Sequence, residues 1–282
     1  MLMKTLKQII SNRNMKTRLL FVFALCALLQ SCGMADAQVI WLTGKNMDFT
    51  NCDSESRDVK PFNAISNSVP FDLIYEQSDE RSVVVEGDGE FFDRLHTDVV
   101  RGTLMVTMDR GRYRNIRLRV RVSCPEIEMI AMNGSGDLIC SNEIETDGDL
   151  TVRMAGSGDI TTQKISCANL KASVAGSGDI SIPEIECDGK VEISVAGSGD
   201  YRSDRVNSGY MSVSVAGSGD IRVSEVEIDE DLSASIAGSG DIRMNGCATN
   251  VEVKIVGSGD VWGDMRYEHI SKTKAGSGSI AW

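Results

Sequence analysis

Apolar and polar residues alternate in short segments along the C-terminal half of the chain. In each segment two apolar residues flank one polar residue, and most of the apolar residues are β-branched. A period of two is typical of a β-strand with one buried face, and β-branched side chains favour strand over helix. The segments are Val152–Met154, Ala172–Val174, Ile193–Val195, Val213–Val215, Ala234–Ile236 and Val253–Ile255.

A Gly-Ser-Gly-Asp turn follows each of these segments. Eight turns of this kind recur at a nearly constant interval, and self-similarity at a period of about 20 residues is the signature of a solenoid. Their glycines are Gly134, Gly136, Gly156, Gly158, Gly176, Gly178, Gly197, Gly199, Gly217, Gly219, Gly238, Gly240, Gly257, Gly259, Gly276 and Gly278. The turns end in Asp137, Asp159, Asp179, Asp200, Asp220, Asp241 and Asp260, and the last ends in Ser279.

Two further apolar columns complete each repeat. The first directly follows the turn, at Leu138, Ile160, Ile180, Tyr201, Ile221, Ile242, Val261 and Ile280. The second lies further on, at Ile144, Ile165, Ile185, Val206, Val226 and Cys247. A coil of about 20 residues with two or three short strands and one fixed corner predicts an all-β fold, a right-handed parallel β-helix whose neighbouring coils supply one another's core. In the last coil Lys272 and Lys274 replace the apolar pair, which predicts a polar cap.

The turn residues raise one structural and one chemical question. Glycine reaches positive φ without steric cost, and a Cβ would be stacked against the next coil, so we interpret the glycines as structural. Aspartates on adjacent coils would repel by about 3 kcal/mol per pair at an effective dielectric of 20. We therefore expect either that the aspartates are turn-stabilising hydrogen-bond acceptors or that they form a cation-binding edge, with Ca²⁺ as the candidate ion.

The chain has eight cysteines and no Cys-x-x-Cys motif, so a zinc or redox site has no support. Cys167 and Cys187 each stand eight residues after the aspartate of their turn. They should occupy one column, alongside Ser208 and Ile228. We expect a buried pair of thiols there, with a disulfide as the alternative.

The region before the repeat has a different pattern. Residues 33–57 are polar and are predicted to form a tether or irregular arm, and residues 58–126 a β-rich cap or the first coils, before the repeats of 127–282. The expected strands are Phe71–Glu76, Ser82–Glu86, Gly102–Met108 and Ile116–Val122, with one helical turn at Glu90–Leu95.

The N-terminus resembles an export signal. Residues 1–32 contain five basic residues, no acidic residue and an apolar run from Leu19 to Leu29, which is too short for a mature membrane span. Leu29-Gln30-Ser31-Cys32 resembles a lipobox, with Cys32 as the lipidation site, and Ala35-Asp36-Ala37 is the competing cleavage site. Without this signal the chain has 24 basic and 41 acidic residues, a net charge of −17. That charge disfavours nucleic acid and direct contact with anionic lipid, so a membrane is expected only through the lipid anchor.

The chain resembles the auto-transporter adhesin head GIN domain family of bacterial envelopes over roughly residues 58–280. The resemblance rests on Val59–Ile65, Phe71–Gln77 and Gly102–Val106, followed by the series of Gly-Ser-Gly-Asp turns from Gly134. It implies N-terminal strands that lead into a right-handed β-helix, and it brings no catalytic residues. The sequence departs from the family at Cys124, where an apolar residue is expected, and at Ser279.

Three functions are compatible with these features. The first is a non-catalytic, adhesin-like scaffold on an outer-membrane lipoprotein, which presents a polar strip to an unidentified glycan or protein. The serines of this polar strip are Ser173, Ser194, Ser212, Ser214, Ser233 and Ser235. The second is a structural or signalling component of an envelope complex. The third is a polysaccharide-active enzyme, which is disfavoured because the acids repeat identically whereas catalysis needs an acid and a base in different environments; the chain also has only two histidines, His96 and His269.

Overall fold

The computed structural model describes Phe49 and residues 51–282 of the chain. The predicted export signal with Cys32, and most of the predicted arm, lie outside the described residues. The strands belong to one compact unit, Cys52–Trp282. Within the described residues no helix is long and apolar enough to cross a bilayer.

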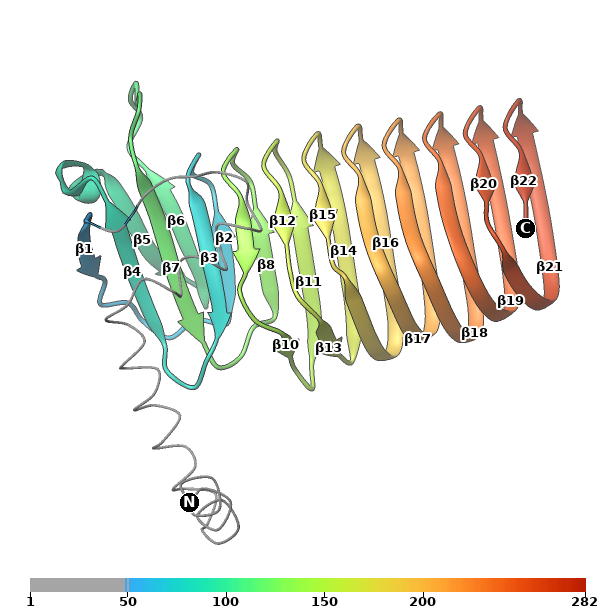
Figure 1. Ribbon diagram of the computed structural model, residues 1–282, viewed down its shortest axis with the longest axis horizontal. Helices are drawn as coiled ribbons and strands as arrows, with labels where there is room; N and C mark the ends of the chain where they lie inside the picture. The colour runs from blue at the N-terminus through green and yellow to red at the C-terminus, as the bar shows by residue number, and fades with distance from the viewer. Residues whose placement is uncertain (1–48, 50) are drawn as a thin grey trace, which may run out of the picture. The chain divides into compact units, whose positions relative to one another are not determined.

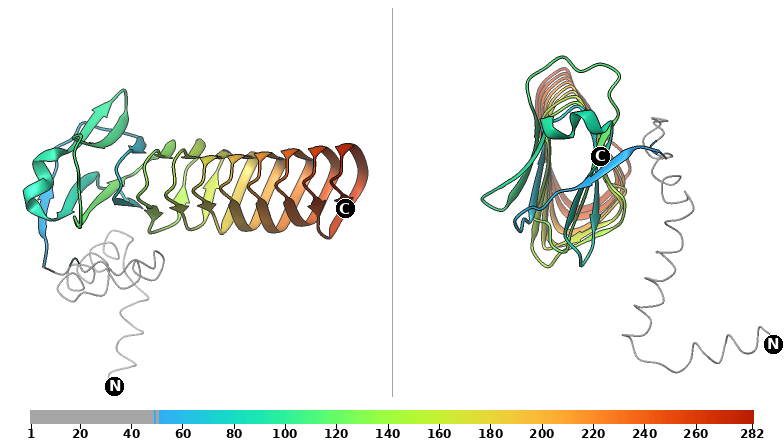
Figure 2. Two further views of the ribbon diagram at one scale, coloured as in Figure 1. Left: turned by 90° about the horizontal axis from the view of Figure 1, so that it is seen from above. Right: turned by 90° about the vertical axis from the view of Figure 1, so that its left-hand side faces the viewer.

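From Met129 onwards the chain winds as a parallel β-solenoid (Figure 1). Each strand pairs in parallel with its equivalent one coil later, so that equal positions of the repeat contact each other, as in the column of Val174, Val195, Val215, Ile236 and Ile255. Seen along the axis, the coils overlie one another (Figure 2). The predicted all-β parallel β-helix is therefore confirmed.

The short and long strands of the solenoid follow one another in chain order. They are β8 (Met129–Met132), β9 (Leu138–Cys140), β10 (Ile144–Glu145), β11 (Asp149–Met154), β12 (Ile160–Thr161), β13 (Ile165–Cys167), β14 (Asn169–Gly176), β15 (Ile180–Ser181), β16 (Glu184–Gly197), β17 (Tyr201–Gly217), β18 (Ile221–Gly238), β19 (Ile242–Gly257), β20 (Val261–Trp262), β21 (Met265–Gly276) and β22 (Ile280–Ala281).

The first coil comes from strands that precede the repeat in sequence. β2 (Ala64–Asn67) pairs in parallel with β8, and β3 (Asp72–Gln77) pairs in parallel with β9. On their other side β2 and β3 pair in parallel with β6 (Thr103–Met108) and β7 (Leu118–Cys124). The chain thus forms one coil with β2 and β3, then forms the strands at the outer end of the solenoid, and continues with β8 on the other side of β2.

The outer end of the solenoid contains the antiparallel pairs. β1 (Asp53–Ser56) and β7 flank β4 (Ser82–Gly87), and β5 (Leu95–Val100) pairs with β6. The 3₁₀ helix η1 (Gly89–Arg94) connects β4 to β5. The four expected strands and the helical turn correspond to β3, β4, β6, β7 and η1, whereas the sequence pattern gave no indication of β1, β2 and β5.

The interior is built almost entirely from aliphatic side chains. The column that directly follows the turns is buried from Leu138 to Val261, and Tyr201 occupies one of its positions with a fully buried side chain. No coil could bury these side chains alone, because each contacts its equivalents in the coils before and after it.

One expected column position is wrong. Cys247 does not continue the column of Val226; Gly246 pairs with Val226, and Cys247 pairs with the outward-facing Glu227. The strand register shifts between Val223 and Val226, so equal spacing from the aspartate no longer gives the equivalent position. Gly246 has φ of 136°, and a Cβ there would collide with the Val226 carbonyl, which explains why glycine replaces the apolar residue.

Two steric reasons require glycine in the turns, and a Cβ on the first glycine would already lie 2.1–2.4 Å from a carbonyl oxygen of the preceding coil. The first glycine has positive φ in six turns, from Gly176 to Gly276. The second glycine has no such φ, but a Cβ on it would lie closer than 3.0 Å to the carbonyl oxygen of the equivalent residue in the preceding coil, which is Phe71 for Gly136 and a glycine for the others. Strand stacking, rather than φ alone, therefore requires glycine at the second position.

The last coil leaves β21 at the edge of the solenoid. Lys272 and Lys274 pair with Val253 and Ile255, whose side chains are buried, but both lysines are exposed. The Lys272 Nζ donates to the Trp282 carbonyl oxygen at 2.6 Å. Charged residues at otherwise inward positions discourage edge-to-edge pairing, which agrees with the predicted cap.

Candidate functional surface

The turn aspartates form a continuous hydrogen-bonded ladder. In each turn one carboxylate oxygen, Oδ1, accepts the backbone N–H of the equivalent residue in the next coil. The donor–acceptor pairs are Asp159–Asp137 at 3.2 Å, Asp179–Asp159 at 3.0 Å, Asp200–Asp179 at 2.8 Å, Asp220–Asp200 at 2.9 Å, Asp241–Asp220 at 2.8 Å, Asp260–Asp241 at 2.8 Å and Ser279–Asp260 at 2.7 Å. The ladder therefore bonds successive coils at the corner where the strands turn.

The ladder begins one coil before the first Gly-Ser-Gly-Asp turn. Asp72 Oδ1 accepts the Asp137 N–H at 3.2 Å, and the Leu73 N–H donates to the Asp137 carbonyl oxygen at 2.8 Å. Sequence reasoning missed Asp72 because no glycine turn precedes it. The available signal was the match of Asp72-Leu73 to Asp137-Leu138, an aspartate directly before a buried leucine.

The ladder ends on a hydroxyl residue. Ser279 donates to Asp260 Oδ1 from its backbone N–H and from its Oγ, the latter at 2.8 Å. These two hydrogen bonds stabilise the ionised carboxylate, so they hold the pKa of Asp260 below its usual range. Ser279 thus supplies the donor of the final rung without adding another negative charge.

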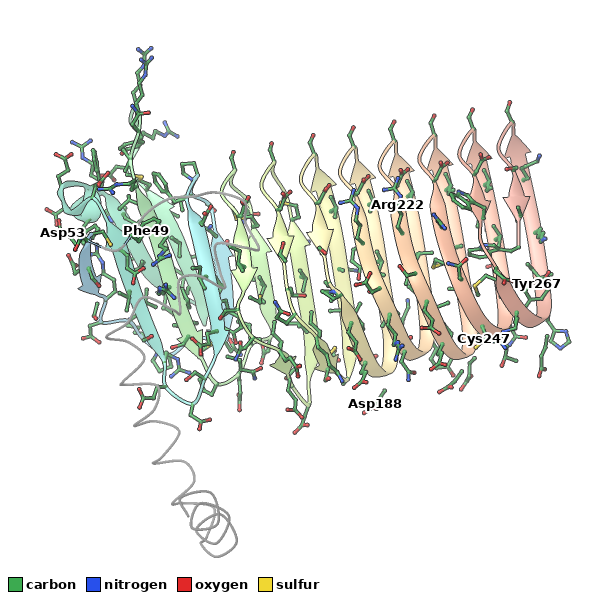
Figure 3. All side chains as sticks on the ribbon, in the orientation of Figure 1. Phe49, Asp53, Asp188, Arg222, Cys247 and Tyr267 are labelled. Atoms are coloured by element: carbon green, nitrogen blue, oxygen red, sulfur yellow. The ribbon has the colours of Figure 1, made fainter. Side chains whose placement is uncertain are left out.

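Two arginines reduce the repulsion between neighbouring carboxylates. Arg202 pairs with Asp179 at 3.1 Å and with Asp200 at 2.9 Å, and Arg222 pairs with Asp200 at 3.2 Å and with Asp220 at 2.6 Å. Figure 3 shows Arg222 on the side of the solenoid where the turns lie. Each guanidinium therefore bridges the Oδ2 atoms of two coils while the Oδ1 atoms bind backbone N–H groups.

The turn aspartates therefore accept hydrogen bonds between coils, and their expected stabilising role stays a prediction. Among the residues that the structure describes, no three histidine, cysteine or acidic side chains are grouped so as to hold a metal ion. The calcium alternative stays a prediction, and the next experiment separates the two.

Replacing Asp241 tests whether the acceptor or the charge matters. Within the described chain Asp241 has no ion pair, and its Oδ1 accepts the Asp260 N–H at 2.8 Å. We expect Asp241→Ala to lower the free energy of unfolding by about 1–2 kcal/mol, because it leaves that N–H unsatisfied. Asp241→Asn retains an acceptor and should stay within about 0.5 kcal/mol of the parent. Urea denaturation measures both; equal losses would instead indicate that the charge matters, as for a bound cation.

A second surface is the outward face of the strands that precede the turns. Its side chains form straight columns because the strands are in register: Ser173, Ser194, Ser214 and Ser235 pair in sequence, and Lys254 continues the column. A neighbouring column contains Ser212 and Ser233. All six predicted serines are half-buried and lie on this face, between the buried residues of each strand. We call it the serine face.

An acidic groove lies at the other edge of the coils. It has a volume of about 970 Å³ and is lined by seven carboxylates, those of Asp79, Glu126, Glu128, Glu143, Glu145, Asp147 and Glu186. Its one basic side chain, Lys164, is already paired with Glu186 at 2.6 Å.

The two histidines lie in different parts of the described chain. His96 lies on β5 at the outer end and bonds to Asp109 at 2.8 Å, whereas His269 lies on β21 in the last coil. The described part of the chain therefore does not bring the two histidines together.

The chain matches one protein-family model over most of its length. The family model described as "Putative auto-transporter adhesin, head GIN domain" matches residues 61–248 and 185–281. A comparison with curated proteins gives no match.

Several solved structures share the fold. A "Putative lipid binding protein" from Parabacteroides distasonis is 28% identical, with a TM-score of 0.66 over 82% of this chain and 96% of that one. A "putative adhesin" from Parabacteroides merdae is 20% identical, with a TM-score of 0.72 over 82% and 96%. Another from Bacteroides fragilis is 21% identical, with a TM-score of 0.60 over 82% and 97%.

Proposed function

Because this chain belongs to the auto-transporter adhesin head GIN domain family, we propose that it is an exported, non-catalytic binding scaffold of the cell envelope. In this proposal the serine face binds a glycan or protein ligand. The observation that carries it is the register of the outward columns, which places small hydroxyl side chains one above another over several coils.

The spacing of the serine face suits an extended ligand. Parallel strands lie about 4.8 Å apart, so the hydroxyls repeat at that interval along the solenoid. Each hydroxyl is both a donor and an acceptor, as are the hydroxyls of a sugar. Small side chains also leave the surface flat, which allows a chain-like ligand to contact several coils at once.

Substitution of one serine tests the serine face. We expect Ser214→Tyr to weaken binding by at least about tenfold, since a bulky side chain on a flat face prevents close contact and about 1.4 kcal/mol already gives that factor. The control is Asn207→Tyr, at an exposed position of β17 outside the serine columns. The binding assay screens the purified protein against surface glycans, envelope proteins and lipid vesicles. Equal effects of the two variants, or none, would exclude the serine face.

The lipid vesicles are included because one relative carries the description of a lipid-binding protein. Binding to vesicles alone, unaffected by Ser214→Tyr, would favour a lipid ligand at another site. Binding to one envelope protein alone, at the serine face, would favour the structural or signalling role over adhesion.

The second part of the proposal concerns location. We propose that the chain is an outer-membrane lipoprotein attached through Cys32, which lies three residues after the apolar run of the export signal. Cys32→Ser should abolish metabolic fatty-acid labelling and move the protein from the membrane fraction to the soluble fraction. Labelling that persists in this variant would contradict attachment at Cys32 and favour another site.

A further inference from the structure

Two cysteine side chains face each other on successive coils. Cys167 on β13 pairs in register with Cys187 on β16, and their Sγ atoms are 3.1 Å apart. Both thiols are free, and both residues are buried, with 7% and 6% of their surface exposed. The column continues through Ser208, Ile228 and Ala248, so the two thiols occupy neighbouring positions of one ladder.

The backbone spacing at this pair suits a covalent bond. Neighbouring strands lie about 4.8 Å apart, and disulfides join Cα atoms about 4.4–6.8 Å apart. Paired residues of a parallel ladder also point to the same side of the sheet, here towards each other. The Sγ atoms, which are 3.1 Å apart, must therefore approach by about 1 Å to reach the S–S bond length of about 2.0 Å.

A solvent-connected cavity gives a reagent access to the pair. Cys167 and Cys187 line a cavity of about 450 Å³ at the edge of the coils, together with Glu145, Asp147 and Asp188. Figure 3 shows Asp188 at the edge of the solenoid, away from the turns. The two thiols are thus buried within the strand ladder but lie beside a surface opening.

We propose that Cys167 and Cys187 form a modification site, at which a disulfide oxidant converts the two thiols into a cross-link between successive coils. The oxidant is a disulfide such as oxidised glutathione. One cysteine thiolate attacks it, forms a mixed disulfide and releases one thiol of the oxidant. The second cysteine then attacks the mixed disulfide, the Sγ–Sγ bond forms, and the second thiol leaves. Two protons and two electrons pass to the oxidant, which is reduced to two thiols.

The hydrogen bond between the two thiols favours ionisation of one of them as the first nucleophile. Either thiol can donate to the other, and the donor stabilises the thiolate of its partner, so the two pKa values are driven apart. The carboxylates of Asp149 and Asp188 oppose ionisation of Cys167, and Asp188 also opposes that of Cys187. Burial likewise opposes ionisation of both thiols. The exchange should therefore be slow at neutral pH and faster as the pH rises.

The other described cysteines in strands have no such partner. Cys124 pairs with Gln77, Cys140 with Tyr75, and Cys247 with Glu227 and Arg266. A cross-link in the folded protein should therefore join Cys167 and Cys187 specifically.

The test is incubation of the purified protein with oxidised glutathione, followed by trypsin digestion under conditions that block free thiols. Trypsin cuts after Lys164, Lys171 and Lys190, so the cross-link should join peptides 165–171 and 172–190 into one species that a reductant separates. Cys187→Ser should abolish this species, whereas Cys247→Ser should leave it unchanged.

A thermal measurement provides an independent readout. The cross-link closes a loop of about 20 residues, so oxidation should raise the Tm of the parent by several degrees and leave that of Cys187→Ser unchanged. Failure of the linked species to form while surface thiols are modified would overturn the inference. That failure would leave the proposed binding function intact, because the oxidant is supplied in vitro and the serine face carries no cysteine.

Discussion

Gly219→Ala is expected to destabilise the solenoid by about 3 kcal/mol or more. Gly219 is the second glycine of its turn, and a Cβ there would collide with the Gly199 carbonyl oxygen and lie 2.8 Å from a methyl group of Val195. The obstruction is backbone on a neighbouring coil, which cannot rotate away as a side chain can. Relief would require two coils to separate, which would break hydrogen bonds such as that from the Gly219 N–H to the Gly197 carbonyl oxygen, at 3.1 Å.

The matched control is Ser218→Ala in the same turn. Ser218 is exposed, and its backbone N–H donates to the Gly197 carbonyl oxygen at 2.9 Å whatever the side chain. We expect this variant to stay within about 0.5 kcal/mol of the parent. Thermal and urea unfolding followed by circular dichroism measure both variants. If the two behaved alike, the steric account of the second glycine would be wrong.

Deletion of one complete coil, residues 201–220, is expected to leave a folded solenoid. The flanking coils have equivalent registers: β16 pairs with β17 and β17 with β18 through the same columns, so Val195 can pair with Ile236 once Val215 is removed. In a solenoid each repeat interacts only with its neighbours, so loss of one repeat removes its own contribution and one interface. We expect a retained β-sheet spectrum, cooperative unfolding and a Tm lower by a few degrees.

Deletion of half a coil, residues 201–210, should instead abolish folding beyond Asp200. The turns that end at Asp200 and Asp220 would then be separated by only half of the usual repeat. That length cannot pass around a circumference that every other coil covers in about 20 residues. Limited proteolysis should degrade the segment of this variant that follows Asp200 and leave the coils before Asp200 protected. Protease resistance of the whole half-coil variant, or collapse of the full-coil variant, would contradict the independent stacking of coils.

The repeat was predictable because it is local. An alternation of apolar and polar residues specifies strands, and a turn at intervals of about 20 residues specifies the coil. Equivalent positions of the sequence repeat therefore stack into columns in the structure. The shared column of Cys167 and Cys187 followed from counting residues from each aspartate, and the outward position of Ser194 followed from its place between Ile193 and Val195. The structure confirms both.

Counting fails where the register shifts. The position of Cys247 was wrong because a bulge in the pairing of β18 and β19 moves the column to Gly246, and a bulge leaves no clear signal in a short strand. The arginine bridges were missed for a related reason. Arg202 and Arg222 follow their aspartates by two residues, but only a side chain that leans across to the preceding coil pairs with two carboxylates.

The sequence by itself determined the coil, its turn and the faces of its strands, because these depend on the residue types within one repeat and on its period. Only the tertiary structure decided that β2 and β3 form the first coil, that Asp72 begins the ladder and that two thiols lie 3.1 Å apart. The reason is physical: those features depend on strand pairing between segments up to 65 residues apart and on side-chain conformation, neither of which a local pattern specifies.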